Sequence, residues 1–188
     1  MRSLTYFVGV TLDGFIAAPD GSFDFFPLTG AFLDFLAAEH PDTLPQHVRA
    51  QLGIDAAPTR RFDAVVMGRR TYQPALELGV PSPYPHLDQH VVSTTLPLDP
   101  APGVTVTEDP LATVRALKAA DGLGVWLAGG GTLAGALLPE IDELVLKRYP
   151  VLAGAGVPVV AGSFAPHAFT LVEERAVDQV TVSRFVRA

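Results

Sequence analysis

The stretch VWLAGGGTLAGALLPE, residues 125–140, places three consecutive glycines between an apolar run and a segment with helical character. The apolar run 125–128 is typical of a buried strand, and the helix is expected to begin near Thr132. Glycines at such a junction either allow a tight turn with close helix–sheet packing, or let an anion reach bare backbone N–H groups. A single glycine would favour the first explanation, whereas three in succession favour the second. The stretch therefore predicts an anion-binding loop after a buried strand.

A second junction repeats this arrangement in VVMGRRTYQPAL, residues 65–76. Gly68 ends an apolar strand, Arg69 and Arg70 follow it, and Thr71 is expected to start a helix. Arginine suits phosphate because its planar guanidinium group donates hydrogen bonds in pairs. A solvated arginine pair on a surface loop is the alternative that these residues alone leave open.

A third junction, VVSTTLP at residues 91–97, ends a strand with the hydroxyl groups of Ser93, Thr94 and Thr95. Polar residues after a strand are common, so this signal carries little weight alone. The carboxyl ends of parallel strands meet at one edge of a sheet, where α/β proteins bind their ligands. We therefore expect the three junctions together to hold one long ligand with several phosphate groups.

The rest of the chain alternates short apolar runs with helical segments and closes on two alternating runs around a polar turn, residues 169–188. Strand–helix repetition followed by a hairpin predicts an α/β sandwich with a mostly parallel sheet and an antiparallel edge. Neither a repeat nor a linker interrupts the pattern, so a single domain over 1–188 is expected. The expected strands are 3–12, 63–68, 90–96, 104–109, 125–128 and 142–152, and the expected helices are 31–40, 71–79, 109–122 and 132–140, with 41–60 ambiguous.

The composition excludes several classes of function. With 188 residues, 48% of them hydrophobic, the chain is expected to be an ordinary globular protein, and its apolar N-terminus a strand rather than a signal peptide. The absence of cysteine excludes disulfides and thiolate chemistry. A net charge of −7 without a basic block argues against nucleic-acid binding, and no apolar run reaches the ~18–20 residues that span a bilayer. The absence of cysteine also leads us to expect a cytoplasmic protein. We expect no metal site, because the five histidines lack the spacing of metal ligands.

Six stretches, in this order, resemble the dihydrofolate-reductase-like family that includes the reductase domain of riboflavin biosynthesis. The resemblance covers nearly the whole chain and implies a three-layer sandwich with a mostly parallel central sheet and an antiparallel C-terminal hairpin. MGR-x-TY and GGGTL are fairly specific together, although neither is specific alone. The matching stretches are VTLDGFIA, VVMGRRTY, VVSTTLP, VWLAGGGTLAGALL, DELVLKRYPVLAGAGVPVV and TVSRFVRA.

The resemblance also implies a cofactor, reduced NADP, bound across the sheet edge. By position, the residues implied for the phosphates are Gly68, Arg69, Arg70 and Thr71, and those for the adenosine ribose are Ser93, Thr94 and Thr95. Gly129, Gly130, Gly131, Thr132 and Leu133 would cover the pyrophosphate and the nicotinamide side, and Gly9, Ile16 and Ala17 would flank the nicotinamide. The residues alone predict a ligand with several phosphate groups, and the resemblance adds the nicotinamide.

The proton donor is not settled by the resemblance. Dihydrofolate reductases carry an acidic residue in their first helix, where Asp34 is the nearest candidate here and a solvated helix residue is the alternative. Asp13, in LDG, is a second candidate for orienting substrate, with a turn-forming aspartate as the alternative. Three phenylalanines either wall a flat aromatic substrate or belong to the core: Phe23, Phe25 and Phe26.

Two hypotheses about function follow. The first is an NADPH-dependent reductase that transfers a hydride to a small heteroaromatic substrate, of pterin, ribosylaminopyrimidine or another type. The second is a non-catalytic nucleotide-binding or regulatory module of the same fold, which keeps the phosphate loops without a proton donor. The apolar final strands predict a homodimer in either case, and no other macromolecular partner is expected.

Overall fold

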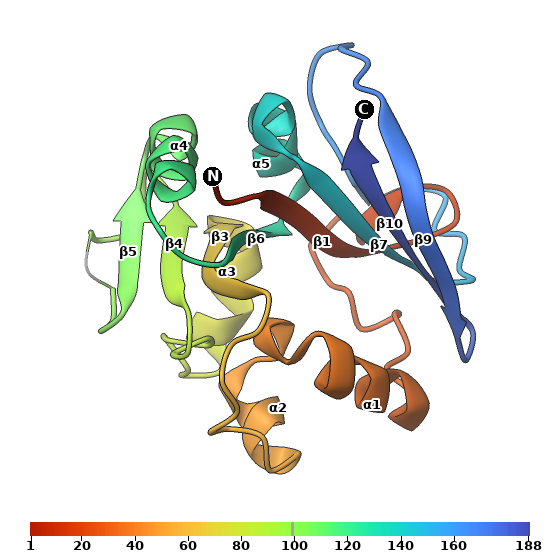
Figure 1. The fold of residues 1–188 in the computed structure, drawn as a ribbon, viewed down its shortest axis with the longest axis horizontal. Helices are drawn as coiled ribbons and strands as arrows, with labels where there is room; N and C mark the ends of the chain where they lie inside the picture. The colour runs from red at the N-terminus through yellow and green to blue at the C-terminus, as the bar shows by residue number, and fades with distance from the viewer. Residues whose placement is uncertain (99) are drawn as a thin grey trace.

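An eight-stranded sheet forms the centre of the computed structural model, which describes residues 1–98 and 100–188 (Figure 1). Its spatial order is β5-β4-β3-β6-β1-β7-β10-β9. In chain order the sheet strands are β1 (Leu4–Val10), β3 (Phe62–Gly68), β4 (Asp88–Val92), β5 (Val104–Thr107), β6 (Gly124–Gly129), β7 (Glu143–Arg148), β9 (Phe169–Val177) and β10 (Val180–Arg187). The helices are α1 (Gly30–Glu39), α2 (Gln46–Gln51), α3 (Arg69–Glu77), α4 (Pro110–Ala119) and α5 (Gly131–Ala136), with short 3-10 turns η1 (Pro41–Thr43) and η2 (Leu138–Glu140).

The direction of the strands confirms the predicted fold class. Every pairing from β5 to β7 is parallel, whereas β7 with β10 and β10 with β9 are antiparallel. The C-terminal hairpin therefore extends a parallel sheet at one edge. A separate two-stranded pair, β2 (Phe15–Ala17) with β8 (Val157–Pro158), lies beside the first strand.

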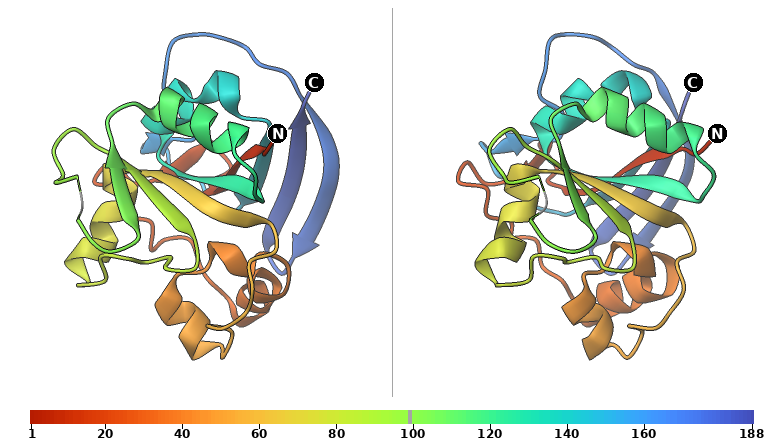
Figure 2. Two further views of the ribbon diagram at one scale, coloured as in Figure 1. Left: turned by 60° about the vertical axis from the view of Figure 1, so that its left-hand side comes forward. Right: turned by 90° about the vertical axis from the view of Figure 1, so that its left-hand side faces the viewer.

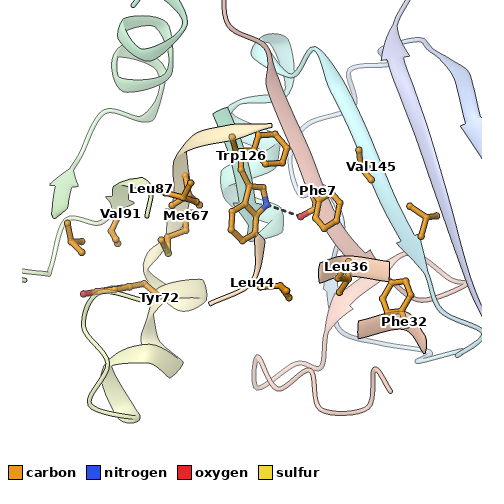
Figure 3. Close-up of a cluster of buried hydrophobic side chains, with 14 of the residues drawn as sticks. Phe7, Phe32, Leu36, Leu44, Met67, Tyr72, Leu87, Val91, Trp126 and Val145 are labelled. Carbon is orange, nitrogen blue, oxygen red and sulfur yellow. Dashed lines mark hydrogen bonds between the residues drawn. The ribbon is translucent and has the colours of Figure 1, made fainter. Parts of the chain in front are cut away.

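Helices cover both faces of the sheet and make the third layer (Figure 2). On one face, α4 and α5 pack their apolar side chains, such as Val114 and Leu133, against the inner strands. On the other face, α1 and α3 contribute Phe32 and Tyr72 to a larger aromatic cluster. Figure 3 shows this cluster, in which the Trp126 indole Nε1–H donates to the carbonyl oxygen of Phe7 at 3.2 Å.

Several helix starts differ from the prediction by one or two residues. Helix α3 begins at Arg69 rather than Thr71, because extended Gly68 passes directly into the helix without a side-chain cap. Pro74, expected in the first turn, therefore lies inside the helix. Helix α5 begins at Gly131, one residue before Thr132. By contrast, the predicted cap of α4 is confirmed, since Asp109 accepts a hydrogen bond from the N–H of Ala112.

The ambiguous segment 41–60 is held by buried polar residues. The Asp42 carboxylate accepts hydrogen bonds from the backbone N–H groups of Arg60, Arg61 and Phe62, which fixes the entry into β3. The buried Arg49 guanidinium donates to the carbonyl oxygens of Pro41 and Ala57. These contacts stabilise η1 and α2, which have little apolar surface of their own.

The final strands leave an open edge. Strand β9 pairs only with β10 among the described strands, and its Leu171 and Val172 are 49% and 45% exposed. An exposed apolar edge strand is a surface on which a second copy could pair, and the homodimer stays a prediction. Within residues 1–98 and 100–188, no helix combines the length and apolar composition that a membrane crossing requires.

Candidate functional site

The predicted junctions lie together at the carboxyl edge of the sheet. Strands β3 and β6 are neighbours, but α3 leaves β3 toward one face and α5 leaves β6 toward the other. Such a point of divergence opens a crevice, which is where α/β sheets bind ligands. The two corners are in contact: an ideal Cβ placed on Gly68 would lie 3.7 Å from the Gly129 carbonyl oxygen and from the Gly130 nitrogen. One ligand can therefore reach both corners.

The three glycines of 129–131 have different structural roles. Gly129 has φ +121°, a backbone conformation that L side chains rarely adopt. A Cβ on Gly129 or Gly130 would face the Thr71 hydroxyl at 3.7 and 4.0 Å, so both positions border the crevice. A Cβ on Gly131, however, would overlap the carbonyl oxygen of Pro158. Close packing against Pro158 therefore explains why residue 131 is a glycine, whereas Gly129 and Gly130 border the crevice.

Two predicted binding residues contact the site differently from the prediction. The Leu133 side chain is buried in the core beneath α5, so only its main chain could face a ligand. Thr132, which follows Gly131 in the first turn of α5, is exposed. The Thr71 hydroxyl, placed beside Gly129 and Gly130, is available to a ligand in the crevice rather than to a helix cap.

The first turn of α3 concentrates positive charge. Arg69 and Arg70 are the first two helical residues, and this turn has neither an acidic residue nor a side-chain cap. A helix N-terminus carries a partial positive charge, so two arginines there are unfavourable unless an anion binds. Both side chains are exposed, which keeps them available to such an anion. The placement argues against a pair that is merely solvated.

A pocket of about 600 Å³ lies between α3 and the end of β4. On one side the Arg69 Nη1 donates to the Thr95 Oγ1 at 2.7 Å. On the other side the buried Ser93 hydroxyl accepts hydrogen bonds from the N–H groups of Thr95 and Leu96, each at 3.1 Å, which shapes the loop. The lining contains two guanidinium groups and no carboxylate: Arg69, Arg70, Gln73, Val92, Ser93, Thr94 and Thr95. This pocket suits an anionic, hydroxylated group.

Gln73 was not identified from the sequence. It stands four residues after Arg69 in α3, which places both on one helix face, and it lines the same pocket. The i, i+4 spacing was the available signal, but the predicted helix began two residues too late to draw attention to it.

Gly9 marks the other end of the edge. An ideal Cβ on Gly9 would lie 3.3 Å from the Tyr149 ring and 3.8 Å from the Phe26 ring. Of the two other predicted nicotinamide neighbours, Ala17 is buried and Ile16 packs against the α5-side core, so their side chains are not free to face a ligand. Their part in binding a nicotinamide stays a prediction.

The three phenylalanines separate into two groups. The Phe26 and Tyr149 rings pack at an angle of 37° with their centroids 4.6 Å apart, and the Phe25 ring centroid lies 4.4 Å from that of Phe26. These rings form an aromatic wall over Gly9, at the margin of the α1-side core. Phe23 is 56% exposed and lies outside that core. A wall for a flat substrate is therefore built from Phe26 and Tyr149, and Tyr149 was not identified from the sequence.

Neither predicted acid has the surroundings of a proton donor. The Asp13 carboxylate accepts hydrogen bonds from the Thr11 hydroxyl and from the N–H groups of Gly154 and Ala153. These bonds, that of Thr11 foremost, lower the pKa of Asp13 to about 2, so it is ionised at neutral pH. Asp34 is exposed on α1, whereas Phe32 and Leu36 of that helix face the core. The geometry favours a loop-fastening Asp13 and a solvated Asp34.

Asp13→Asn is expected to lower Tm at pH 7, because the neutral amide accepts the three hydrogen bonds less strongly. A carboxylate whose folded pKa is depressed stabilises the protein above its unfolded pKa of about 3.9 and loses this effect as pH falls toward 2. The difference in Tm between wild type and variant should therefore close between pH 4 and 2. Thermal unfolding across this range checks it, with exposed Asp34→Asn as the control. A difference that persists unchanged at pH 2 would contradict the assignment.

The carboxyl edge of the sheet carries a row of donors that a ligand with several phosphate groups would need. The main chain at Gly68, Gly129 and Gly130 lies next to the arginine-lined pocket. This pocket is at the end of β4, three strand spacings away from Gly9 on β1. With strands spaced about 4.8 Å apart, the edge from β4 to β1 spans about 14 Å. The donors along it are backbone N–H groups, guanidinium groups and hydroxyls, as polyphosphate binding requires.

Comparisons with known proteins point to the same fold. The family model of the RibD C-terminal domain matches residues 2–183. The uncharacterised protein YwjB of Bacillus subtilis (strain 168) is 28% identical over 161 residues, which are 84% of this chain and 82% of YwjB. A crystal structure of a provisionally named riboflavin biosynthesis protein from Shewanella sp. PV-4 has a TM-score of 0.70 at 24% identity, over 100% of this chain and 99% of that one. This last likeness shows the fold.

The family match begins before β1 and ends within β10, so it contains every corner of the crevice and both pocket arginines. The resemblance drawn from the six sequence stretches is thereby confirmed. The chain belongs to the RibD C-terminal domain family, whose fold is dihydrofolate-reductase-like.

Proposed function

We propose that this protein is an NADPH-dependent reductase that transfers a hydride to a small heteroaromatic substrate. The observation that carries the proposal is the joined pair of corners at Gly68 and Gly129, with the arginine-lined pocket beside them. NADPH, when bound, supplies the hydride, and the protein contributes binding, orientation and exclusion of water.

Different residues of the protein bind different parts of the cofactor. Arg69 and Arg70 hold the 2′-phosphate in the pocket, where Ser93 and Thr95 border the ribose. The main chain at 129–132 and the Thr71 hydroxyl hold the pyrophosphate. Gly9, three strand spacings away from β4, is the position that we assign to the nicotinamide end, next to the Tyr149 and Phe26 rings.

The substrate side is aromatic. The Phe26 and Tyr149 rings, inclined by 37° to each other, offer an apolar aromatic surface, which suits a pterin, a ribosylaminopyrimidine or another planar heterocycle. A small heteroaromatic compound is therefore the substrate class that we propose.

The second candidate, a non-catalytic nucleotide-binding module, is favoured by one observation. Asp13 is fastened to the loop at 153–154 and Asp34 is solvated, so neither predicted acid is placed to donate a proton.

Fluorescence titration with NADPH tests the proposal, followed by turnover assays on dihydropterins, aminopyrimidine nucleotides and quinones. We expect saturable binding below millimolar cofactor and oxidation of NADPH with at least one acceptor. Absence of binding by folded protein at millimolar NADPH would remove the proposal. Tight binding without turnover on any acceptor would favour the non-catalytic module.

A further inference from the structure

The α1 face of β7 carries a half-buried lysine, Lys147, beside the Phe7 ring. Lys147 stands in register with Gly9 on β1 and with Val182 on β10. Its Nζ lies 4.5 Å from the centre of the Phe7 ring. Among the described residues, no carboxylate lies within ion-pair distance of this amine and no acceptor takes a hydrogen bond from it. The amine instead makes a cation–π contact with the Phe7 ring, which leaves its N–H groups without a protein acceptor.

The other charged and titratable groups of this face are engaged or neutral. His40, at the end of α1, lies 4.8 Å from Phe7, and burial lowers its pKa to about 4, so it is neutral at pH 7. Glu143, earlier on β7, pairs with Arg61 and Arg184. Arg175 of β9 lies over the Phe35 ring at 5.2 Å. Burial raises the pKa of Tyr149 to about 12, which keeps its hydroxyl protonated.

Lys147 is one strand beyond Gly9, where the nicotinamide end is proposed to lie. Tyr149, two residues further along the same face, covers Gly9 together with Phe26. Because these two rings occupy the space directly over Gly9, a flat substrate would lie against the outer side of this aromatic wall. Lys147 carries the lysine amine on this face of the sheet, two residues before Tyr149. Burial also lowers the pKa of Lys147 to about 8, so that it carries a proton at pH 7 and can release it.

We propose that Lys147 is the proton donor of the reaction, a role that rests on the proposed reductase function. The substrate is then a heterocycle in which a ring nitrogen or carbonyl oxygen adjoins the carbon that accepts the hydride. As the new C–H bond forms, the substrate's C=N or C=O π bond breaks. The freed electron pair takes a proton from the Lys147 ammonium, and NADPH is oxidised to NADP⁺. The neutral amine then regains a proton from water.

Amine labelling tests whether the group can be reached, without any turnover. The chain has only two lysines, and Lys118 is ion-paired with Asp142 at 2.8 Å. Brief acetylation by acetic anhydride between pH 6 and 10, quantified by mass spectrometry, gives each lysine its own profile. We expect Lys147 to react with a midpoint near pH 8 in the folded protein, and to be protected by NADP⁺ together with an acceptor. An amine that does not react when folded would overturn the proposal.

Lys147→Met is expected to lower kcat at least about 100-fold on the acceptor that turns over, while the Kd for NADPH stays within about twofold. For wild type, kcat should fall as pH rises through 8, because the protonated amine is the active form. Lys147→Arg should move this break above pH 10, and the methionine variant should lose it. Methionine keeps the apolar stem of the side chain and removes the amine, so an unchanged Tm shows that the variant is folded.

The outcomes separate the two proposals. If Lys147→Met binds NADPH normally and keeps kcat and its pH break, the role of Lys147 is wrong and the reductase stands. If the wild type itself fails to bind NADPH, the reductase proposal fails first, which the binding titration reports independently of any lysine variant.

Discussion

Replacing Arg69 and Arg70 together with alanine is expected to weaken NADPH binding about 100-fold or more and to leave the Kd for NADH within about threefold. Both guanidinium groups line the pocket that we assign to the 2′-phosphate, and NADH lacks that phosphate. A hydrogen bond to a charged group contributes about 1.5–3 kcal/mol, and every 1.4 kcal/mol is tenfold in Kd. Fluorescence titration with both cofactors measures the ratio directly.

The single variants should differ from each other. Arg69 donates to the Thr95 hydroxyl and so also shapes the ribose side of the pocket, whereas Arg70 makes no hydrogen bond or ion pair within the described residues. Arg70→Ala should therefore affect the phosphate alone. Arg115→Ala is the control, because this exposed arginine of α4 pairs with Glu140 of η2, and neither residue lines the pocket. Equal losses for NADPH and NADH in the double variant would refute the 2′-phosphate assignment.

The predictions that succeeded rest on local patterns. The glycine and arginine corners could be identified from the sequence, because the end of a strand and the start of the next helix are neighbours in the chain. These corners are Gly68 to Arg70 and Gly129 to Gly130. The parallel sheet then brought them together, since every parallel strand delivers its carboxyl end to one edge. The resemblance added the cofactor, which neither glycine nor arginine specifies.

Most of the contacts that the sequence did not reveal join residues far apart in the chain. Gly131 is a glycine because Pro158 lies against it, and Asp13 is fastened by Ala153 and Gly154 about 140 residues later. A single sequence gives no signal for such pairs. The start of α3 was placed at Thr71 because a hydroxyl is a common cap, yet Gly68 leads into the helix without one. Lys147 was overlooked because its register with Gly9 exists only in the folded sheet.

Gly135→Ala is expected to destabilise the protein by about 3 kcal/mol, a loss of about 6–12 °C in Tm for a chain of this size. A Cβ at this position would overlap the carbonyl oxygen of Ala161 and lie 2.8 Å from its carbonyl carbon. Both are backbone atoms, so the clash cannot be relieved by rotation of a side chain. The segment is also fastened to α5, because the N–H of Ala161 donates to the Gly131 carbonyl at 3.0 Å.

The matched control is Gly30→Ala at the start of α1, where a Cβ would meet nothing within 4 Å and φ lies outside the left-handed region. Alanine favours helix there, so Tm should hold or rise slightly. Because α5 follows directly from the Gly130 corner, a shifted helix also moves that corner away from Gly68. Gly135→Ala should therefore lose NADPH affinity even at temperatures where it remains folded, whereas Gly30→Ala should not. Equal Tm values for the two alanine variants would show that the 157–161 segment yields easily, and that the third glycine of the loop is not fixed by packing.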